Sequence, residues 1–285
     1  MALYQFNIVA GILVAFISNF LLKDIGSSAW RWMIGVEAIP AIIYTLLVFT
    51  VPKSPRWLYS KGNKEVADRI MLSLGQEPIG NSASIESKNH PQEAGKSIFQ
   101  KKYRRIVFLS FFIALFIQLS GIYAFLYFAP RIFEESGLET SSALLSSVGI
   151  GVTNLIFTML GVYLIDRTGR KKLMYIGSFG YIASLFLVAL AFFLDWGGIS
   201  VPVFFFVFIA SHAVGQGSVI WVFISEIFPN DLRASGQAFG SSVHWVLAAI
   251  IPSIVPFLFS VIGPGMVFIA FGLFMIGQLI WAFLF

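Results

Sequence analysis

Eight long apolar runs, separated by polar loops, fill most of this 285-residue chain. Most of the runs reach the roughly 20 residues that a helix needs to cross a hydrocarbon core about 30 Å thick. A water-soluble globule could not bury this much apolar surface, because 58% of the residues are hydrophobic and only 12% are charged. The predicted membrane-spanning helices cover residues 4–22, 31–51, 105–133, 142–165, 171–194, 201–228, 233–258 and 263–285.

The fold class expected from these runs is an all-α membrane protein with about eight transmembrane helices and one long loop. A transmembrane β-barrel would instead need segments of about 10 residues with alternating polarity, and the sequence has none. We expect two spans in residues 1–52, a cytoplasmic loop in 53–104 and six spans in 105–285. Within the loop, residues 62–75 predict a short amphipathic helix, and the Gly-, Ser- and Asn-rich residues 76–98 predict a flexible linker.

Positive charge is concentrated on one side of the predicted spans. Eleven of the nineteen Lys and Arg lie in residues 52–105, four more lie in the turn 166–172, and Arg233 follows on the same side. The other side carries Lys23, Arg31 and Arg131. The positive-inside rule therefore places the long loop and both termini in the cytoplasm. We expect an integral multi-pass protein of the bacterial inner membrane whose basic groups contact lipid and no nucleic acid.

The sequence offers little for catalysis or metal binding. It contains no cysteine, which excludes disulfides and thiolate metal sites. Its three histidines, His90, His212 and His244, are too scattered to suggest a metal cluster. It also has no recognisable catalytic triad, paired-carboxylate site or Gly-rich phosphate loop. We therefore expect neither an enzyme nor a cofactor.

Four motifs occur in a specific order along the chain. They are Pro52-Lys53-Ser54-Pro55-Arg56-Trp57-Leu58, Gln118-Leu119-Ser120-Gly121-Ile122 with Tyr127-Phe128-Ala129-Pro130, Asp166-Arg167-Thr168-Gly169-Arg170-Lys171, and Ser225-Glu226-Ile227-Phe228-Pro229. From Gln5 to the end, this set closely resembles the sugar porter family of the major facilitator superfamily. The resemblance implies a partial major facilitator fold, corresponding to helices five to twelve of a proton-coupled sugar transporter, with the first four helices absent.

The resemblance also implies a function, namely secondary active transport of a monosaccharide by alternating access with proton symport. The implied partners are the monosaccharide, protons, membrane lipid and the missing first four helices. Two alternatives remain open, a truncated inactive transporter fragment and a non-transporting sugar sensor. Such sensors usually carry long cytoplasmic extensions, and neither terminus of this sequence has one.

Neutral hydrogen-bonding groups and aromatic faces suit a sugar, which has many hydroxyls and no charge. The resemblance assigns the substrate contacts to Gln5, Gln118, Tyr123, Asn154, Trp221, His244 and Trp245. Tyr123 stands where the family often has an asparagine, and its larger ring would shrink or reshape the pocket. The alternative is that the amides bond neighbouring helices, as lone polar groups in membranes often do. His212 and Gln216, four residues apart, could line the same cavity or form a packing hydrogen bond.

The charges of the cytoplasmic motifs suggest a latch between helix ends. The latch residues are Arg56, Asp166, Arg167, Arg170, Glu226 and Arg233. Glu226 lies at the membrane edge, where an unpaired carboxylate is costly, so we expect it to pair with Arg233, Arg170 or Arg56. Such pairs would hold the inner side closed and break when the two halves rock. The alternative is that these charges only anchor helix ends at the lipid headgroups.

Glu37 is an acidic residue inside the second predicted span. Because burying its charge in a membrane is costly, an ionisable residue there suggests a function. Proton-coupled members of the family resemble the chain at this point, and there an acidic residue is thought to join an aspartate on helix one and an arginine on helix four. We therefore expect Glu37 to take part in a proton relay. The alternative is a glutamate at the outer edge, within reach of the interface.

Overall fold

The computed structural model describes residues 2–78 and 97–284, in which every regular element is a helix. Contacts divide the chain into a larger unit, Met1–Met33 with Ser97–Phe285, and a smaller unit, Ile34–Lys96. Within the described residues, eight helical segments are long and apolar enough to cross a membrane. The predicted all-α membrane fold with about eight spans is therefore confirmed.

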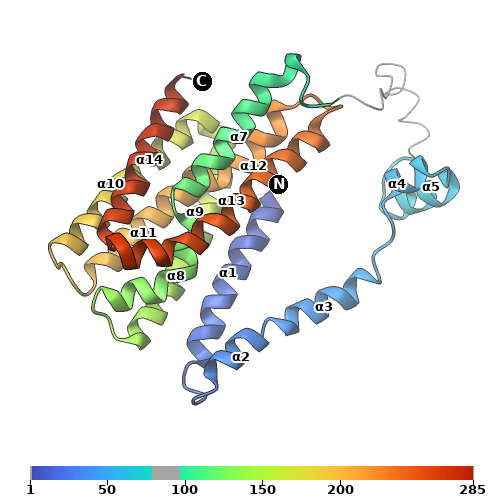
Figure 1. Cartoon of the computed structure of the whole chain (residues 1–285). Helices are drawn as coiled ribbons and strands as arrows, with labels where there is room; N and C mark the ends of the chain where they lie inside the picture. The colour runs from blue at the N-terminus through green and yellow to red at the C-terminus, as the bar shows by residue number, and fades with distance from the viewer. Residues whose placement is uncertain (1, 79–96, 285) are drawn as a thin grey trace. The chain divides into compact units, whose positions relative to one another are not determined.

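The helices of the larger unit run side by side as a bundle (Figure 1). Helix α1 packs on α9, and α10 packs on both α11 and α14. The elements of this unit, apart from α2 at its border, are α1 (Ala2–Leu22), η1 (Lys101–Tyr103), α7 (Arg104–Leu119), α8 (Ile122–Glu135), α9 (Thr140–Thr168), α10 (Arg170–Phe193), α11 (Ser200–His212), the π-helical η2 (Ala213–Gly217), α12 (Ser218–Ile227), α13 (Arg233–Ile262) and α14 (Pro264–Leu284).

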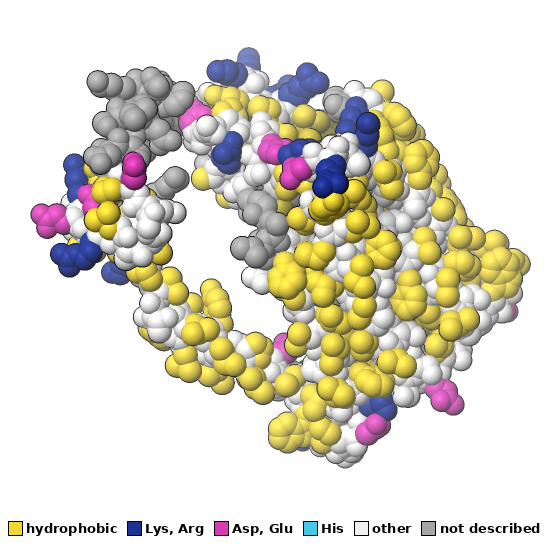
Figure 2. Space-filling model, turned by 180° about the vertical axis from the view of Figure 1, so that it is seen from behind, with side chains coloured by type: hydrophobic (Ala, Val, Ile, Leu, Met, Phe, Trp, Pro, Cys, Tyr) yellow, Lys and Arg dark blue, Asp and Glu magenta, His cyan; other side chains and the backbone are white. Residues whose placement is uncertain are grey.

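Aromatic rings fill the core of the bundle. Phe125 of α8 is fully buried and stacks on Phe208 of α11 at 4.2 Å and on Phe268 of α14 at 5.2 Å. The outer surface is also apolar, as the exposed Ile156 and Phe257 illustrate. Figure 2 shows hydrophobic side chains covering the flank of the helical body, with charged groups towards its ends. An apolar flank of this kind belongs in lipid, so the chain is an integral membrane protein.

The third predicted span, 105–133, is broken into α7 and α8 at Ser120 and Gly121. Gly121 has φ of +78°, a left-handed conformation that residues with a Cβ atom rarely adopt. A Cβ atom at this position would also lie 2.6 Å from the ring of Phe271. The predicted span is confirmed within the helical segment Lys101–Glu135, and the glycine inside it allows a bend that hydropathy does not reveal.

The sixth predicted span, 201–228, also contains an irregular turn. The π-helical η2 separates α11 from α12, and Gly215 within it packs directly against Gly177 of α10. A Cβ atom at Gly215 would lie 2.8 Å from the Cα of Gly177. The hydroxyl of Ser218 donates to the carbonyl of Ala213 at 2.7 Å, which satisfies a backbone acceptor inside the irregular turn.

The second predicted span, 31–51, is divided into α2 (Ala29–Gly35) and α3 (Ala38–Val48) by a turn at Val36 and Glu37. Pro40 explains the break, because it has no N–H group and its ring crowds the carbonyl of the residue four positions earlier.

Two short helices follow in the smaller unit. They are α4 (Pro55–Ser60), which the sequence did not predict, and α5 (Lys64–Ser73), which lies within the range 62–75 predicted to be helical. They pack together and bury Leu58 and Ala67. Most of the predicted linker over 76–98 lies outside the described residues, so its flexibility remains a prediction.

Candidate functional site

A cavity of about 50 Å³ lies inside the larger unit, and we call it the central cavity. Residues from α1, α7, α8, α9, α11, η2, α12 and α13 line it. Five of the seven predicted substrate contacts are among them, namely Gln5, Tyr123, Asn154, Trp221 and His244. All of the lining residues are uncharged, with the histidines taken as neutral. The fold thus gathers hydrogen-bonding groups that are distant in sequence around one neutral space.

Gln118, another predicted contact, lies behind His244 rather than on the cavity wall. Its amide nitrogen lies 3.1 Å from Nδ1 and 3.2 Å from Nε2 of His244. Both side chains are buried, with exposed fractions of 1% and 3%. The hydroxyl of Tyr123 lies 3.3 Å from Nε2 of the same imidazole. His244 therefore connects α13 to α7 before the break at Gly121 and to α8 after it.

Aromatic rings surround this imidazole. The ring of Trp221 lies 4.9 Å from that of His244 and the ring of Trp245 lies 5.1 Å from it, both in edge-to-face arrangements. Trp245 is 43% exposed and is not a lining residue of the central cavity. The structure therefore places this predicted contact next to Tyr123 and His244, and its direct contact with substrate remains a prediction.

Two further lining residues extend the polar wall. Thr158 follows Asn154 by one turn of α9, and its hydroxyl donates to the amide oxygen of Asn154 at 3.4 Å. His212, at the end of α11, also lines the cavity, in agreement with one of the two roles considered for it. Thr158 was missed, although its position four residues after Asn154 places it on the same helical face.

Several buried polar atoms in the described part of the chain have no hydrogen-bond partner, and two of the residues that carry them, Gln5 and His212, line the central cavity. These atoms include Oε1 of Gln5, Oε1 of Gln118, Nδ1 of His212 and both amide atoms of Gln216. Gln118 in turn holds the wall residue His244. Because buried polar groups in proteins are nearly always hydrogen-bonded, this set is suited to a guest that carries many hydroxyls.

A second cavity of about 260 Å³ adjoins the first. Both are lined by Gln5 and Trp221, so these two side chains lie between them. The second cavity extends to Asp166, Arg170 and Glu226 at the helix ends. The two cavities thus form a path from the neutral centre of the bundle towards its charged end.

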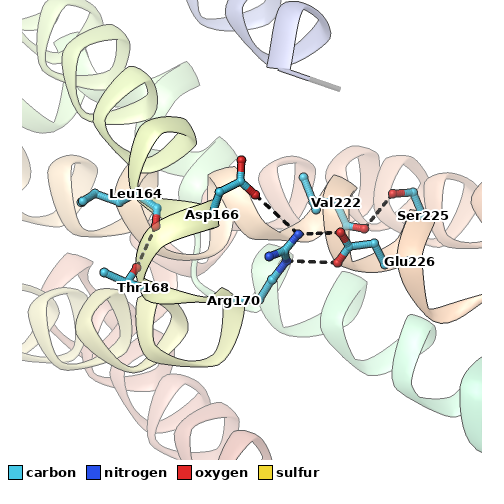
Figure 3. A network of polar contacts seen from close by, with 7 residues as sticks. All are labelled: Leu164, Asp166, Thr168, Arg170, Val222, Ser225 and Glu226. Carbon is cyan, nitrogen blue, oxygen red and sulfur yellow. Dashed lines mark hydrogen bonds and ion pairs between the residues drawn. The ribbon is translucent and has the colours of Figure 1, made fainter.

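An ion pair stands at that end of the path, between the start of α10 and the end of α12 (Figure 3). Arg170 donates from Nε to Glu226 at 3.0 Å and from a terminal nitrogen to the other carboxylate oxygen at 2.6 Å. Asp166, one turn before Arg170, approaches the same guanidinium at 3.7 Å. Of the three arginines that were expected as partners of Glu226, Arg170 forms the ion pair.

Arg167 and Arg233 are two further predicted latch residues in the larger unit. Arg167 stacks its guanidinium on the ring of Tyr163 at 4.2 Å. Arg233 is the first residue of α13 and is exposed. Arg56 belongs to α4, and its side chain lies outside the described residues.

Glu37 belongs to the smaller unit and is exposed in the turn before α3, where its carbonyl accepts the N–H of Ala41 at 3.4 Å. Glu37 thus lies within the candidate span Ala29–Val48, at the turn that divides it into α2 and α3. The relay role remains a prediction.

The comparisons with known proteins agree on one family. The family model described as "Sugar (and other) transporter" matches residues 1–285. The D-xylose-proton symporter of Escherichia coli strain K12 is 34% identical over 251 residues, which cover 85% of this chain and 51% of the symporter. The D-xylose transporter of Levilactobacillus brevis is 32% identical over 283 residues, covering 95% and 61%. The chain thus spans about half to three fifths of the length of these relatives.

Solved structures agree with the sequence comparisons. The partially occluded, inward-open conformation of the xylose transporter XylE from E. coli matches with a TM-score of 0.85 at 28% identity. The match covers 100% of this chain and 62% of XylE. A second structure, the proton:xylose symporter XylE bound to 6-bromo-6-deoxy-D-glucose, matches with a TM-score of 0.79 at 28% identity, covering 100% and 63%. By sequence and by fold, the chain belongs to the sugar porter family of the major facilitator superfamily, a family of transporters and not of enzymes.

Proposed function

We propose that this chain forms part of a secondary active transporter that moves a monosaccharide by alternating access with proton symport. The observation that carries the proposal is the pair of unpartnered polar atoms on lining residues of the central cavity, Oε1 of Gln5 and Nδ1 of His212, with the unpartnered Oε1 of Gln118 next to the wall residue His244. A sugar offers a donor and an acceptor at each hydroxyl, so it can satisfy amide and imidazole groups without bringing a charge into the membrane.

The chemistry of the wall supports a monosaccharide as the substrate. Gln5 and Asn154 provide amides that both donate and accept, and the ring of Trp221 provides an apolar face for sugar C–H groups. Names of relatives also support this class, since they include D-xylose and arabinose symporters and a glucose transporter. The same residues are the substrate contacts that we propose, together with Gln118, Tyr123, His244 and Trp245.

The arrangement of the two cavities supports alternating access. The path that they form ends at the ion pair of Arg170 with Glu226, where we propose a cytoplasmic latch. Breaking and forming such a pair would accompany the opening and closing of the inner side. Arg56, Arg167 and Arg233 complete the proposed latch when the rest of the transporter is present.

For proton coupling, we propose that Glu37 acts in a relay whose other members lie in the first four helices of a complete transporter. Proton symport in relatives supports this assignment. We also propose a bacterial inner membrane as the location, with both termini in the cytoplasm. In support, the end of α14 lies beside the first turns of α10, since the hydroxyl of Tyr175 donates to the carbonyl of Ala282 at 3.1 Å.

The alternative function is a truncated fragment that does not transport. The chain spans 51–61% of the length of two relatives. In complete transporters of this kind, the substrate cavity lies between the two halves of the protein. We therefore expect residues 1–285 alone to bind sugar without supporting normal uptake.

The test is reconstitution of the chain in liposomes with radiolabelled D-xylose, with and without a co-expressed polypeptide that supplies four preceding helices. We expect uptake only with the added helices, and its loss when Gln118 is replaced by leucine. Robust uptake by the chain alone would overturn the requirement for those helices. Sugar binding without uptake in either preparation would favour a sensor or an inactive fragment. An absence of binding would overturn the proposed substrate.

A further inference from the structure

His212 is a buried imidazole on the wall of the central cavity. It is the last residue of α11, directly before the π-helical η2, and its exposed fraction is 7%. Its ring stacks on that of Phe208 with centroids 6.3 Å apart. A Cβ atom at Gly217 would lie 3.3 Å from Cδ2 of the imidazole, so the ring also packs closely against the backbone of η2. These contacts hold the imidazole in place at the cavity.

One nitrogen of this imidazole has no partner. Nδ1 of His212 is buried and makes no hydrogen bond within the described part of the chain. In a neutral imidazole one ring nitrogen donates and the other accepts, whereas in the imidazolium both donate. Buried polar atoms are nearly always hydrogen-bonded, so Nδ1 is suited to a partner that a ligand brings. Protonation of His212 would also break no hydrogen bond at this atom.

His244 lines the same cavity, but its ring nitrogens are already engaged. The amide nitrogen of Gln118 lies 3.1 Å from Nδ1, and the hydroxyl of Tyr123 lies 3.3 Å from Nε2. Because an amide N–H donates, the ring nitrogen that receives it has to accept and cannot carry a proton. Of the two histidines on the cavity wall, His212 is therefore the one that takes a second proton without losing a hydrogen bond.

No fixed charge on the cavity wall compensates a proton at His212. Helix α11 and η2 contact α8, α9, α10 and α12, whose Lys, Arg, Asp and Glu residues lie near the helix ends and do not line the central cavity. The other titratable groups here are His244 and Tyr123 on the wall, and Tyr181 of α10, whose hydroxyl donates to Gln278. An unpaired charge inside an apolar bundle is costly. His212 therefore takes up a proton only together with an anion.

We propose that the central cavity accepts a sugar carboxylate, such as a hexuronate, and that His212 binds one proton from solution together with it. The carboxylate accepts the N–H of the imidazolium in a charge-assisted hydrogen bond, and the sugar hydroxyls meet the amides of Gln5 and Asn154. The two opposite charges cancel, so the filled cavity has the same net charge as with a neutral sugar. The inference rests on the proposed function, because it names a further substrate class for the same cavity.

The signature of this mode of binding is an affinity that depends on pH. The complex holds one more proton than the separate chain and anion, so the affinity rises as the pH falls, by up to about tenfold per pH unit. A sugar carboxylate itself stays ionised above about pH 4.5. D-glucuronate and D-glucuronamide are the matched probes, because they have the same skeleton and similar size and differ in charge.

Binding of each radiolabelled probe to the full chain in lipid nanodiscs is measured at about pH 7.5 and about pH 5.5. We expect D-glucuronate to bind at least about tenfold more tightly at the lower pH, and D-glucuronamide to change by less than about twofold. His212→Phe keeps a stacking ring and His212→Gln keeps hydrogen-bonding groups, but neither side chain takes up a proton. Both variants should remove the pH dependence for D-glucuronate.

His244→Gln is the matched control, since it removes the other imidazole of the cavity. It should leave the pH dependence in place, whatever its effect on the affinity itself. A dependence that survives in both His212 variants, or that disappears in His244→Gln, would overturn the assignment to His212. Binding of D-xylose or D-glucuronamide without binding of D-glucuronate at either pH would overturn the carboxylate class and leave the proposed function intact. Binding of none of the three would overturn the proposed function and this inference together.

Discussion

The amide nitrogen of Gln118 lies within 3.2 Å of both ring nitrogens of His244, although 126 residues separate the two in sequence. This contact joins α7 to α13 behind the central cavity, and the other amide atom of Gln118, Oε1, is buried without a partner. Gln118 thus holds His244 in the cavity wall and also carries an acceptor, Oε1, that has no hydrogen-bond partner. Its removal tests the binding role of the cavity against a purely packing role.

Replacement of Gln118 by leucine should weaken monosaccharide binding by about 10- to 100-fold. The substitution leaves a buried nitrogen of His244 unsatisfied and removes the acceptor Oε1, at a cost of about 1–3 kcal/mol. Binding titrations of the reconstituted chain measure this effect. The matched control is Gln278→Leu, because Gln278 is fully buried in α14 and accepts hydrogen bonds from Ser178 and Tyr181, away from the cavity. If both variants bind sugar equally well, Gln118 has only a packing role.

The ion pair of Arg170 with Glu226 should contribute modestly to stability, since their side chains are 35% and 48% exposed. A double-mutant cycle with Arg170→Ala and Glu226→Ala should give a coupling of about 0.2–1 kcal/mol in thermal unfolding. Arg131 and Glu135 form an ion pair within one helix and provide the control. In a complete transporter, only loss of the first pair should change the balance between inward- and outward-facing states. Equal effects of the two pairs on that balance would mean that Arg170 and Glu226 merely anchor helix ends.

Replacement of Gly121 by alanine should destabilise the chain by about 2–4 kcal/mol. The left-handed backbone costs about 1–3 kcal/mol for a residue with a Cβ atom, and overpacking against Phe271 adds to this cost. Gly137→Ala separates the two effects, because Gly137 also has a positive φ of +95° but has open space around it. Denaturation in detergent micelles should show the larger loss at Gly121. Equal losses would show that Phe271 yields to the methyl group.

Glu37→Gln should abolish proton-driven accumulation of sugar in a transporter completed by the first four helices, while exchange of labelled for unlabelled sugar continues. The amide cannot carry the proton but keeps the size and the hydrogen-bonding capacity of the carboxyl group. Uptake measured with and without an imposed pH gradient separates the two activities, and Glu37→Asp is the conservative control. Unchanged accumulation in Glu37→Gln would remove this residue from the relay.

Much of the fold could be predicted from hydropathy and length, because a bilayer imposes a minimum length on every span. The breaks could not be predicted, since they depend on local features inside apolar runs. Pro40 and Gly121 are visible in the sequence, but each is also tolerated in unbroken membrane helices. The irregular turn at η2 depends on the close approach of Gly215 to Gly177 of another helix, which only the folded bundle creates.

The candidate site was predicted less completely. Gln5, Asn154 and Trp221, which the family resemblance assigned to the substrate, line the cavity in the structure, but the resemblance could not show that Gln118 contacts His244 from behind. The sequence left three arginines as partners of Glu226, because spacing along the chain does not reveal which helix ends adjoin. Thr158 was overlooked since a single hydroxyl in a membrane helix usually bonds to its own backbone.

The most direct measurement of the central claim uses the absence of cysteine from the chain. A cysteine in place of Ile8, on the cavity wall, is compared with one in place of Ile156, which is 57% exposed on the apolar flank of α9. Reaction with a small water-soluble thiol reagent is followed in reconstituted membranes, with and without D-xylose. The account predicts that the Ile8→Cys variant reacts and that the sugar slows its reaction, while Ile156→Cys reacts slowly and without regard to sugar. Reaction at the cavity position that no monosaccharide slows would contradict it.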